Sequence, residues 1–440
     1  MNFTRKSVVV IGAKRSGLAG AELLVKQGAR VRVMDSEVLP AEEQARFDAL
    51  GVPVVKQSPE NLTADVIVIS PGVPYDLPML ADARRRGVPV IGEVEMAAYF
   101  LKGPIIGITG SNGKTTTTAL TGHLLRECGI ASQVGGNIGR AVTSLIGSST
   151  PEQWNVLELS SFQLESIEQF RARIAGCLNV TPDHLDRHHT FENYAAAKRR
   201  LFETQKKGDF AVLNYEDETC REFALHTAAQ VFWFSSSQSV PRGVSADREE
   251  MCFAGQPFMK RRQIRLRGIH NLENVMAAAL MAHLAGAKLA DLGPAVESFP
   301  GVEHRIEFVR TLDGVDYFND SKATNVDAVL KAVEAFPGNL WIILGGKDKG
   351  SDYVPLREPL RQKAKAALLI GAAAPLIAQA LDSAVPLVES GDVTGAVRYA
   401  RSHASAGDVV LLAPACASFD QFKNFEERGL HFKQVVAELF

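Results

Sequence analysis

The 440-residue sequence has few cysteines, no excess of charge of either sign and no long hydrophobic run. Its five cysteines are scattered without a pair two residues apart, which argues against a structural zinc site and a disulfide framework. A net charge of −2 gives no basis for binding nucleic acid or an anionic membrane. The longest apolar stretch, Ala366 to Ala378, contains glycine and proline and falls short of the ~18 residues that span a bilayer. The apolar run after the basic residues Met1 to Ser7 is too short for a signal peptide, so we expect a soluble, cytoplasmic protein.

The most informative stretch is a glycine-rich turn between an expected strand, Ile105 to Thr109, and an expected helix that opens with Lys114 and four threonines. Glycines let backbone N–H groups close on phosphate oxygens, and a helix N-terminus adds its positive end. The strict pattern has glycine where Ile108 stands, and an ordinary strand–turn–helix with a solvated lysine is the alternative. We favour a nucleoside triphosphate site, with Lys114 on the β/γ-phosphates and Thr115 or Thr116 on magnesium. The loop residues expected at ATP are Gly110, Ser111, Asn112, Gly113, Lys114, Thr115 and Thr116.

The first 93 residues have the pattern of half a Rossmann unit. A strand at Ser7 to Ile11 enters a glycine-containing turn, and a second strand at Arg30 to Met34 ends in Asp35, which typically contacts a ribose. Lys14 replaces the central glycine of the dinucleotide fingerprint, so a mononucleotide with an anionic tail fits better than NAD. Further strands are expected at 66–69 and 88–91, and Gly72 follows the first of them either at a ligand-binding edge or in a plain turn.

Residues 94–299 alternate strands and helices after the phosphate loop, as a parallel sheet requires. The turn from Gly135 to Gly139 is either structural or a second anion site. Glu158 lies in an apolar strand and needs a partner, for which magnesium is the obvious choice. A strand expected at Cys177 to Val180 leads into a turn where Asp183, His184, Asp186 and His188 crowd together, which favours a metal or catalytic role. The stretch 242–267 is expected to be rich in hairpins.

Lys198 is the most unusual residue of the helix that follows. It shares one helical stripe with Phe191, Tyr194, Leu201 and Gln205, so its ammonium faces the core. Such a cation must snorkel, find a partner or lose its charge. Snorkelling is the common solution, and folding back onto the site of His184 is the alternative.

Residues 300–440 return to strand–helix alternation, with strands expected at 341–344, 366–370 and 409–412. Their polar loops, at 320–325, 345–350 and 415–420, all follow strands and are expected to share one carboxyl edge. The predicted fold is α/β with three domains: an N-terminal Rossmann-like unit (1–93), a central P-loop mononucleotide-binding sheet (94–299) and a C-terminal Rossmann-like domain (300–440).

Five stretches together resemble the Mur ligase family: the phosphate loop, Gly135 to Gly139, Glu158 to Leu164, Asp183 to Asp186, and His270-Asn271. The segments Asp320 to Asn325 and Ala415 to Gly429 are similar to those of the branch that adds D-glutamate to UDP-N-acetylmuramoyl-L-alanine. The resemblance covers all three domains. It implies that the first domain binds the uridine nucleotide, the second binds ATP and magnesium, and the third binds the incoming amino acid.

The resemblance also implies residue roles. Contacts to the UDP-sugar are expected from Arg15, Ser16, Asp35, Ser36, Gly72, Asn137 and His184. ATP is expected to meet the phosphate loop, Asn271, Asn274, Arg305, Asp320 and Lys322, and D-glutamate is expected to meet Thr324, Lys349, Ser418 and Phe425. Two magnesium ions are expected on Thr115, Glu158, His184 and a carbamylated Lys198; Lys114, Glu158, His184 and Lys198 form the catalytic set. Glu37 stands where some relatives have a basic residue, which leaves the outer uridine pocket less defined.

The implied reaction is amide formation through an acyl phosphate made from ATP, by an enzyme that acts as a monomer. A folylpolyglutamate-type ligase shares the ATP machinery, but the uridine-suited first domain and the Asp320 to Asn325 segment argue against it. A dehydrogenase would need the missing central glycine. A nucleotide-switched binding protein remains as a non-catalytic alternative, and it predicts no acceptor-dependent release of phosphate.

Overall fold

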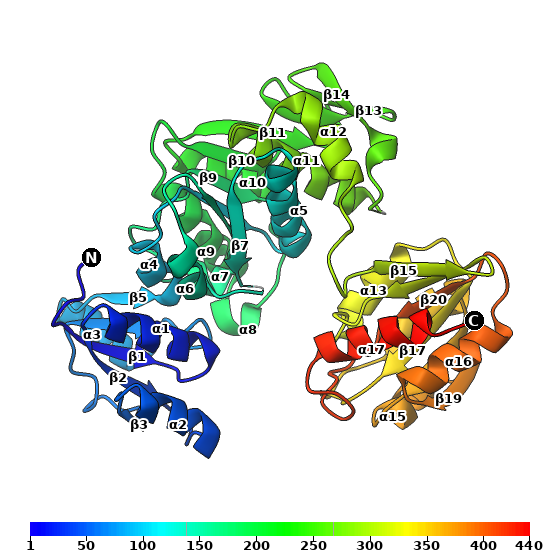
Figure 1. Cartoon of the computed structure of the whole chain (residues 1–440), viewed down its shortest axis with the longest axis horizontal. Helices are drawn as coiled ribbons and strands as arrows, with labels where there is room; N and C mark the ends of the chain where they lie inside the picture. Colours follow the sequence, from blue (N-terminus) through cyan, green and yellow to red (C-terminus); the bar gives the residue numbers. More distant parts are fainter. Residues whose placement is uncertain (138, 267) are drawn as a thin grey trace. The chain divides into compact units, whose positions relative to one another are not determined.

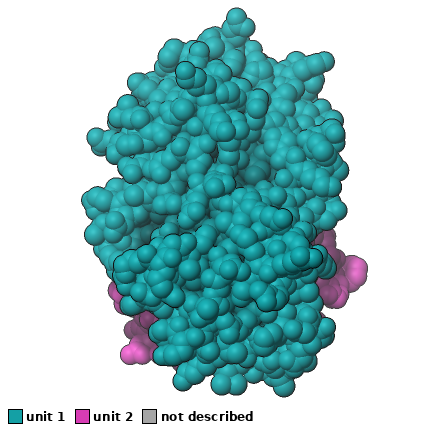
Figure 2. All heavy atoms as spheres, turned by 90° about the vertical axis from the view of Figure 1, so that its left-hand side faces the viewer, with its two compact units in different colours: residues 1–299 teal, residues 300–440 magenta. Residues whose placement is uncertain are grey.

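The computed structural model describes residues 1–137, 139–266 and 268–440 of the chain. It has two compact units, Met1–Phe299 and Pro300–Phe440, which Figure 2 colours separately. The first unit holds two of the three sheets and the second unit holds the third. Within the described residues no helix is long and apolar enough to cross a membrane. The predicted α/β class is confirmed.

A five-stranded, all-parallel sheet begins the first unit, with strand order β3-β2-β1-β4-β5 (Figure 1). Its central strands, apart from the partly buried Ser7 at the start of β1, are short apolar runs that are buried, as parallel sheets between helices require. The order reverses between β1 and β4, where ligands bind in open α/β sheets. The strands are β1 Ser7–Ile11, β2 Arg30–Asp35, β3 Val54–Lys56, β4 Val66–Ile69 and β5 Val90–Gly92. The helices are α1 Arg15–Lys26, α2 Ala41–Ala49, α3 Pro78–Arg85 and α4 Glu93–Ala98.

Helix α4 joins this sheet to the next one. Its Met96 packs in the core of the five-stranded sheet, whereas Val94 and Ala97 pack in the core of the nine-stranded sheet. Between them, the buried carboxylate of Glu95 accepts backbone N–H groups of residues 168, 169 and 170 at 2.8–3.0 Å and the Tyr99 hydroxyl at 2.8 Å. Each of these bonds to a charged acceptor is stronger than a neutral one, so α4 is firmly attached to the second sheet.

A nine-stranded mixed sheet completes the first unit, in the order β14-β13-β12-β11-β10-β9-β6-β8-β7. The predicted hairpins are confirmed, because β12, β13 and β14 pair antiparallel; Arg267, at the end of that predicted stretch, lies outside the described residues. The strands are β6 Ile105–Thr109, β7 Ser132–Gly136, β8 Trp154–Glu158, β9 Ile174–Cys177, β10 Phe210–Asn214, β11 Gln230–Ser235, β12 Gly243–Ala246, β13 Glu250–Phe253 and β14 Gln256–Lys260. The α-helices are α5 Lys114–Glu127, α6 Val142–Leu145, α7 Ser161–Leu164, α8 Leu185–His188, α9 Phe191–Glu203, α10 Glu218–Phe223, α11 Ile269–Leu284 and α12 Leu289–Glu297, and 3-10 turns lie at Ile146–Ser148, Ala224–His226 and Arg261–Gln263.

Two sequence expectations about this sheet were wrong in detail. The strand expected at Cys177 to Val180 is β9, Ile174–Cys177, three residues earlier, because these four residues are the ones that pair with β6 and β10. The glycine-rich turn was expected to begin at residue 135. Gly135 and Gly136 are instead the last two residues of β7 and pair with β8. Ile138, within that motif, lies outside the described residues.

The second unit is a six-stranded sheet in the order β15-β16-β20-β17-β18-β19, parallel except for β15. Strands β16, β20 and β17 are parallel neighbours, so the three polar loops that follow them lie at one edge, as predicted. The strands are β15 Glu307–Leu312, β16 Val315–Asn319, β17 Leu340–Gly345, β18 Ala364–Ile370, β19 Leu387–Gly391 and β20 Val409–Leu412. The helices are α13 Val326–Glu334, α14 Arg357–Lys363, α15 Ala374–Leu381, α16 Val393–His403 and α17 Phe425–Ala437, with a 3-10 turn at Val354–Leu356.

Candidate active site

The phosphate loop connects β6 to α5, as the sequence predicts. Gly113 has a φ of +82°, which L-residues rarely adopt, and a Cβ there would lie 2.2 Å from Oδ1 of Asn274. Glycine is therefore required for both the backbone turn and the approach of α11. Lys114, Thr115 and Thr116 form the first turn of α5, with both threonines buried.

Hydrogen bonds from the neighbouring strand end hold the loop in place. The Ser111 hydroxyl lies 3.0 Å from the Thr181 carbonyl oxygen and 3.0 Å from the Tyr194 hydroxyl. The backbone N–H of Asn112 donates to the side chain of Asn179 at 2.8 Å. A loop fixed in this way has its N–H groups oriented before a phosphate arrives, which lowers the entropy cost of binding.

Lys114 and Lys198 converge on this loop from two helices, α5 and α9. The Lys114 ammonium donates to the carbonyl oxygens of Gly110 and Ser111 at 2.8 and 2.9 Å. The Lys198 ammonium donates to the same Gly110 carbonyl oxygen at 2.9 Å. Of the two alternatives left by the sequence, snorkelling to solvent is excluded, because Lys198 is buried and its ammonium bonds to the phosphate loop.

Lys198 is 1% exposed, and its nitrogen lies 4.4 Å from the centre of the Tyr194 ring. Burial, and secondly the charge of Lys114, lower the pKa of Lys198 to about 7. Near neutral pH this side chain is therefore a mixture of ammonium and neutral, nucleophilic amine.

Glu158 ends β8 beside the loop and is 2% exposed. Its Oε1 accepts the Asn137 side-chain amide at 3.0 Å, and the backbone of Asn137 also pairs with Glu158. Its Oε2 is buried and has no hydrogen-bond partner among the described residues. A buried carboxylate oxygen without a donor is costly, and a cation such as magnesium satisfies it. The residues present therefore fit the predicted metal.

The histidine-rich turn divides into an exposed part and a structural part. His184 is half exposed in a left-handed conformation, and its ring centre lies 4.9 Å from that of Phe162, with the ring planes tilted by 56°. His188 is buried, with its ring nitrogens near the Ser161 hydroxyl (2.9 Å) and Glu165 (3.0 Å), and burial lowers its pKa to about 4. Across residues 1–137, 139–266 and 268–440, no group of three His, Cys, Asp or Glu residues is arranged to hold a metal ion. The crowding of acidic and histidine residues in this turn is therefore not itself a metal centre.

Asn271 and Asn274, in the first turns of α11, lie against the phosphate-loop helix. The Asn274 amide donates to the Asn271 side-chain oxygen at 3.0 Å and its own oxygen accepts the Thr117 hydroxyl at 3.2 Å. Both residues predicted to meet the nucleotide thus lie next to the loop.

At the first sheet, Asp35 ends β2 and accepts the backbone N–H groups of Ala13 and Glu37 at 2.7 and 3.0 Å. Arg15 and Ser16 are the first two residues of α1, Ser36 follows Asp35, and Gly72 follows β4. Arg187 ties this edge to the second sheet, because its guanidinium bonds the Val73 carbonyl oxygen at 2.8 Å and Glu165 at 3.0 Å.

In the second unit, Asp320 directly follows β16 and is buried. Burial raises its pKa to about 6, opposed by the charges of Arg305 and Lys322. Thr324 follows in the same loop, Lys349 lies in the loop after β17, Ser418 lies in the loop after β20, and Phe425 begins α17. The structure brings these predicted residues to one sheet edge.

Sequence reasoning missed two positioning residues. Tyr194 holds Ser111 and lies against Lys198; its place four residues before Lys198 on the same stripe was the available signal. Arg428 is 1% exposed and donates to the Ser321 and Cys416 carbonyl oxygens at 2.9 and 3.2 Å, so it clamps two of the polar loops together. Nothing in the local pattern distinguishes it from a surface arginine.

The chain matches three family models in succession. Residues 6–92 match the MurD-like N-terminal domain of Mur ligases, residues 108–282 the Mur ligase middle domain, and residues 304–416 the Mur ligase glutamate ligase domain.

Curated relatives match over the full length. This chain is 59% identical to the UDP-N-acetylmuramoylalanine–D-glutamate ligase of Solibacter usitatus, over 97% of both chains. It is 48% identical to the enzyme of the same name from Acidobacterium capsulatum, over 99% of this chain and 97% of that one.

Solved structures show the same fold at lower identity. UDP-N-acetylmuramate-alanine ligase MurC of Thermotoga maritima is 18% identical, with a TM-score of 0.60 over 98% of this chain and 99% of that one. A pseudomurein peptide ligase type C from Methanothermus fervidus is also 18% identical, with a TM-score of 0.57 over 99% and 100%.

Proposed function

The chain belongs to the Mur ligase family, and from that premise we propose that it joins D-glutamate to UDP-N-acetylmuramoyl-L-alanine at the expense of ATP. The product is a precursor of peptidoglycan. One observation carries the proposal: a fixed phosphate loop, with two lysines on one of its carbonyls, in a chain that resembles D-glutamate ligases from end to end.

The reaction begins with an unreactive carboxylate. Its oxygen attacks the γ-phosphorus of ATP, the bond to ADP breaks, and an acyl phosphate forms. The amine of D-glutamate then attacks the acyl carbon, and the tetrahedral intermediate loses phosphate to give the amide. Water competes in the second step, so the amine must be positioned and water excluded.

Different residues of the chain have different roles in this reaction. The N–H groups of the loop hold the phosphates, and Lys114 balances the charge that collects on the transferred phosphoryl group. Asn271 and Asn274 support the nucleotide side of the loop. In the second unit, Arg305, Asp320 and Lys322 are proposed to contact ATP, and Thr324, Lys349, Ser418 and Phe425 to hold D-glutamate.

Magnesium, when bound, supplies charge neutralisation at the phosphates. Thr115, Glu158, His184 and Lys198 would hold it, and the buried Oε2 of Glu158 supports this assignment. A Lys198 ammonium would repel the metal, whereas a carbamate would offer it an oxygen. The lowered pKa of Lys198 supplies the neutral amine that reacts with CO2 to give that carbamate and a proton.

The UDP-sugar is proposed to bind at the carboxyl edge of the five-stranded sheet. Asp35, Ser36 and Gly72 lie at that edge, and Arg15 and Ser16 begin the following helix. Asn137 and His184 would meet the end of the substrate that reacts. The enzyme is proposed to work as a monomer in the cytoplasm, where ATP and the precursor are available.

The decisive assay measures phosphate release from ATP with UDP-N-acetylmuramoyl-L-alanine and a panel of amino acids. We expect turnover with D-glutamate and none with L-glutamate or meso-diaminopimelate. Equal release with both enantiomers of glutamate would refute the substrate assignment. A nucleotide-switched binding protein would release no phosphate in response to any acceptor.

The carbamate is tested separately from turnover. The protein is equilibrated with 13C-labelled bicarbonate and examined by 13C NMR, where a carbamate carbon gives a signal distinct from bicarbonate. The signal is expected in the unchanged protein and absent from Lys198→Arg, while Lys207→Arg, an exposed lysine after the same helix, retains it. An identical spectrum for all three proteins would refute the carbamate.

A further inference from the structure

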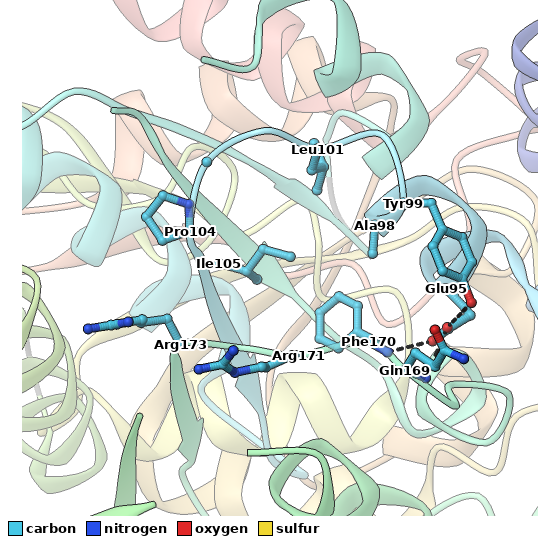
Figure 3. A pocket seen from close by; sticks show the side chains of 11 residues that line it. Glu95, Ala98, Tyr99, Leu101, Pro104, Ile105, Gln169, Phe170, Arg171 and Arg173 are labelled. Atoms are coloured by element: carbon cyan, nitrogen blue, oxygen red, sulfur yellow. Dashed lines mark hydrogen bonds between the residues drawn. The ribbon is translucent and has the colours of Figure 1, made fainter. Parts of the chain in front are cut away.

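A cavity of about 310 Å³ lies where the first sheet is joined to the second, between α4, the connection to β6 and the segment before β9 (Figure 3). It is distinct from the phosphate site. Ile105 begins β6 at the cavity, whereas the phosphate loop follows the far end of that strand, about 15 Å away at a strand rise of about 3.3 Å per residue.

The cavity is lined by apolar side chains, with charged side chains on two opposite sides. Figure 3 shows aliphatic and aromatic side chains around the hollow, the Glu95–Tyr99 pair on one side and two arginines on the other. The apolar lining residues are Ala98, Leu101, Pro104, Ile105 and Phe170. The lining is a mixture of apolar and polar groups, and the volume is at the lower end of the range of small-molecule sites.

The charged side chains at the two ends of the cavity differ in how available they are to bind an incoming molecule. Glu95 is 1% exposed and already accepts four hydrogen bonds, so its oxygens are saturated by the chain itself. Arg171 forms a two-pronged pair with Asp209, with both bonds at 2.7 Å.

Arg173 differs from both. It is exposed at the cavity, and its charge is close enough to the Asp209 carboxylate to be attracted by it. No hydrogen bond or close ion pair of its guanidinium is found among the described residues, so its N–H donors can still reach a ligand. The guanidinium carries up to five N–H donors, and it matches a carboxylate or similar anion in shape and charge.

We propose that this cavity binds a small amphipathic organic anion, such as an aryl-alkyl carboxylate, with its carboxylate on Arg173 and its apolar body between Leu101, Ile105 and Phe170. The bound molecule lies under the connection 99–104, which links α4 to β6. It thereby stiffens the joint between the two sheets without occupying the nucleotide sites.

The test uses three probes of one shape on the full chain: 4-phenylbutyrate, 4-phenylbutanol and 4-phenylbutylamine, titrated by calorimetry. The anion is expected to bind most tightly and the amine not at all. Arg173→Gln should weaken binding of the anion about tenfold or more, the usual effect of losing a charge-assisted hydrogen bond. The matched control Arg46→Gln, an exposed arginine on α2, should leave the affinity unchanged.

Ala98→Phe, which fills the cavity from α4, should abolish binding. Equal affinity for the anion and the amine would overturn the proposal. It would also be overturned by an Arg173→Gln variant that binds 4-phenylbutyrate like the unchanged protein, or by displacement of the anion by ATP or UMP, which would place it at the nucleotide sites.

Discussion

Lys114 and Lys198, from two different helices, donate hydrogen bonds to the same carbonyl oxygen, that of Gly110, at 2.8 and 2.9 Å. Burial, and secondly the nearby charge of Lys114, lower the pKa of Lys198 to about 7. The two lysines therefore meet at a single backbone group of the phosphate loop.

The first prediction concerns this lysine. Lys198→Ala is expected to lose at least about a hundredfold in kcat, because the proposed metal ligand is gone, and to recover partly when a short carboxylic acid fills the space. Steady-state phosphate release with and without added acetate measures both effects. Lys207→Ala serves as the control and should keep full activity. Near-normal turnover of Lys198→Ala in CO2-depleted buffer, with unchanged dependence on magnesium, would rule out the role.

The second prediction separates backbone strain from ATP binding at two glycines. Gly113→Ala and Gly129→Ala both place alanine at positive φ, +82° and +72°, and both should lose about 1–2 kcal/mol of stability. At Gly113 the new methyl group also meets Asn274, whereas nothing lies within 4 Å at Gly129. Only Gly113→Ala should therefore raise the KM for ATP. Thermal unfolding and ATP titrations measure the two effects, and similar ATP kinetics in the two variants would contradict the assignment.

The third prediction is a pH dependence of stability from Asp320. Its pKa is about 6 in the folded chain and about 4 when unfolded, so the native state binds more protons between those values. The free energy of unfolding therefore falls as pH rises from about 4 to about 6 and stays lower above pH 6.

Asp320→Asn removes this ionisation. The variant should be more stable than the unchanged protein at pH 7.5, by roughly 1–3 kcal/mol, and equal to it near pH 4, while ATP-dependent turnover is lost. Chemical denaturation at the two pH values measures the difference, with the exposed Asp382→Asn as control. A variant that is less stable at pH 7.5 would disprove the buried ionised carboxylate.

The fourth prediction concerns recognition of the amino acid. Lys349→Ala is expected to raise the KM for D-glutamate about ten- to a hundredfold with little change in the KM for ATP, since an acidic substrate loses a charge-assisted contact. Lys347→Ala, two residues earlier in the same loop, is the matched control. If the KM for ATP rose instead, the role would belong to the nucleotide site.

Features set by local pattern could be predicted from sequence. The phosphate loop has its own glycine spacing, and the stripe through Tyr194 and Lys198 shows which face of α9 is buried. The common edge of the three loops in the second unit follows from each loop coming after a parallel strand.

Features set by tertiary contacts could not be predicted from the sequence. Strand β9 lies three residues before its predicted position, because its bounds depend on its pairing with β6 and β10, which are distant in the sequence. The clamp made by Arg428 also exists only once two distant loops meet. The burial of this arginine is a property of the assembled fold.

The attachment of α4 through Glu95 has a consequence for how this sequence can diverge. The three donors at residues 168, 169 and 170 are backbone N–H groups, which every residue except proline provides. The acceptor is one particular side chain. The side chains of the exposed residues 168 and 169 can therefore change without loss of these bonds, whereas Phe170 is held in the core and loss of the Glu95 carboxylate removes all three bonds at once. The joint between the two sheets therefore depends far more on position 95 than on positions 168 and 169.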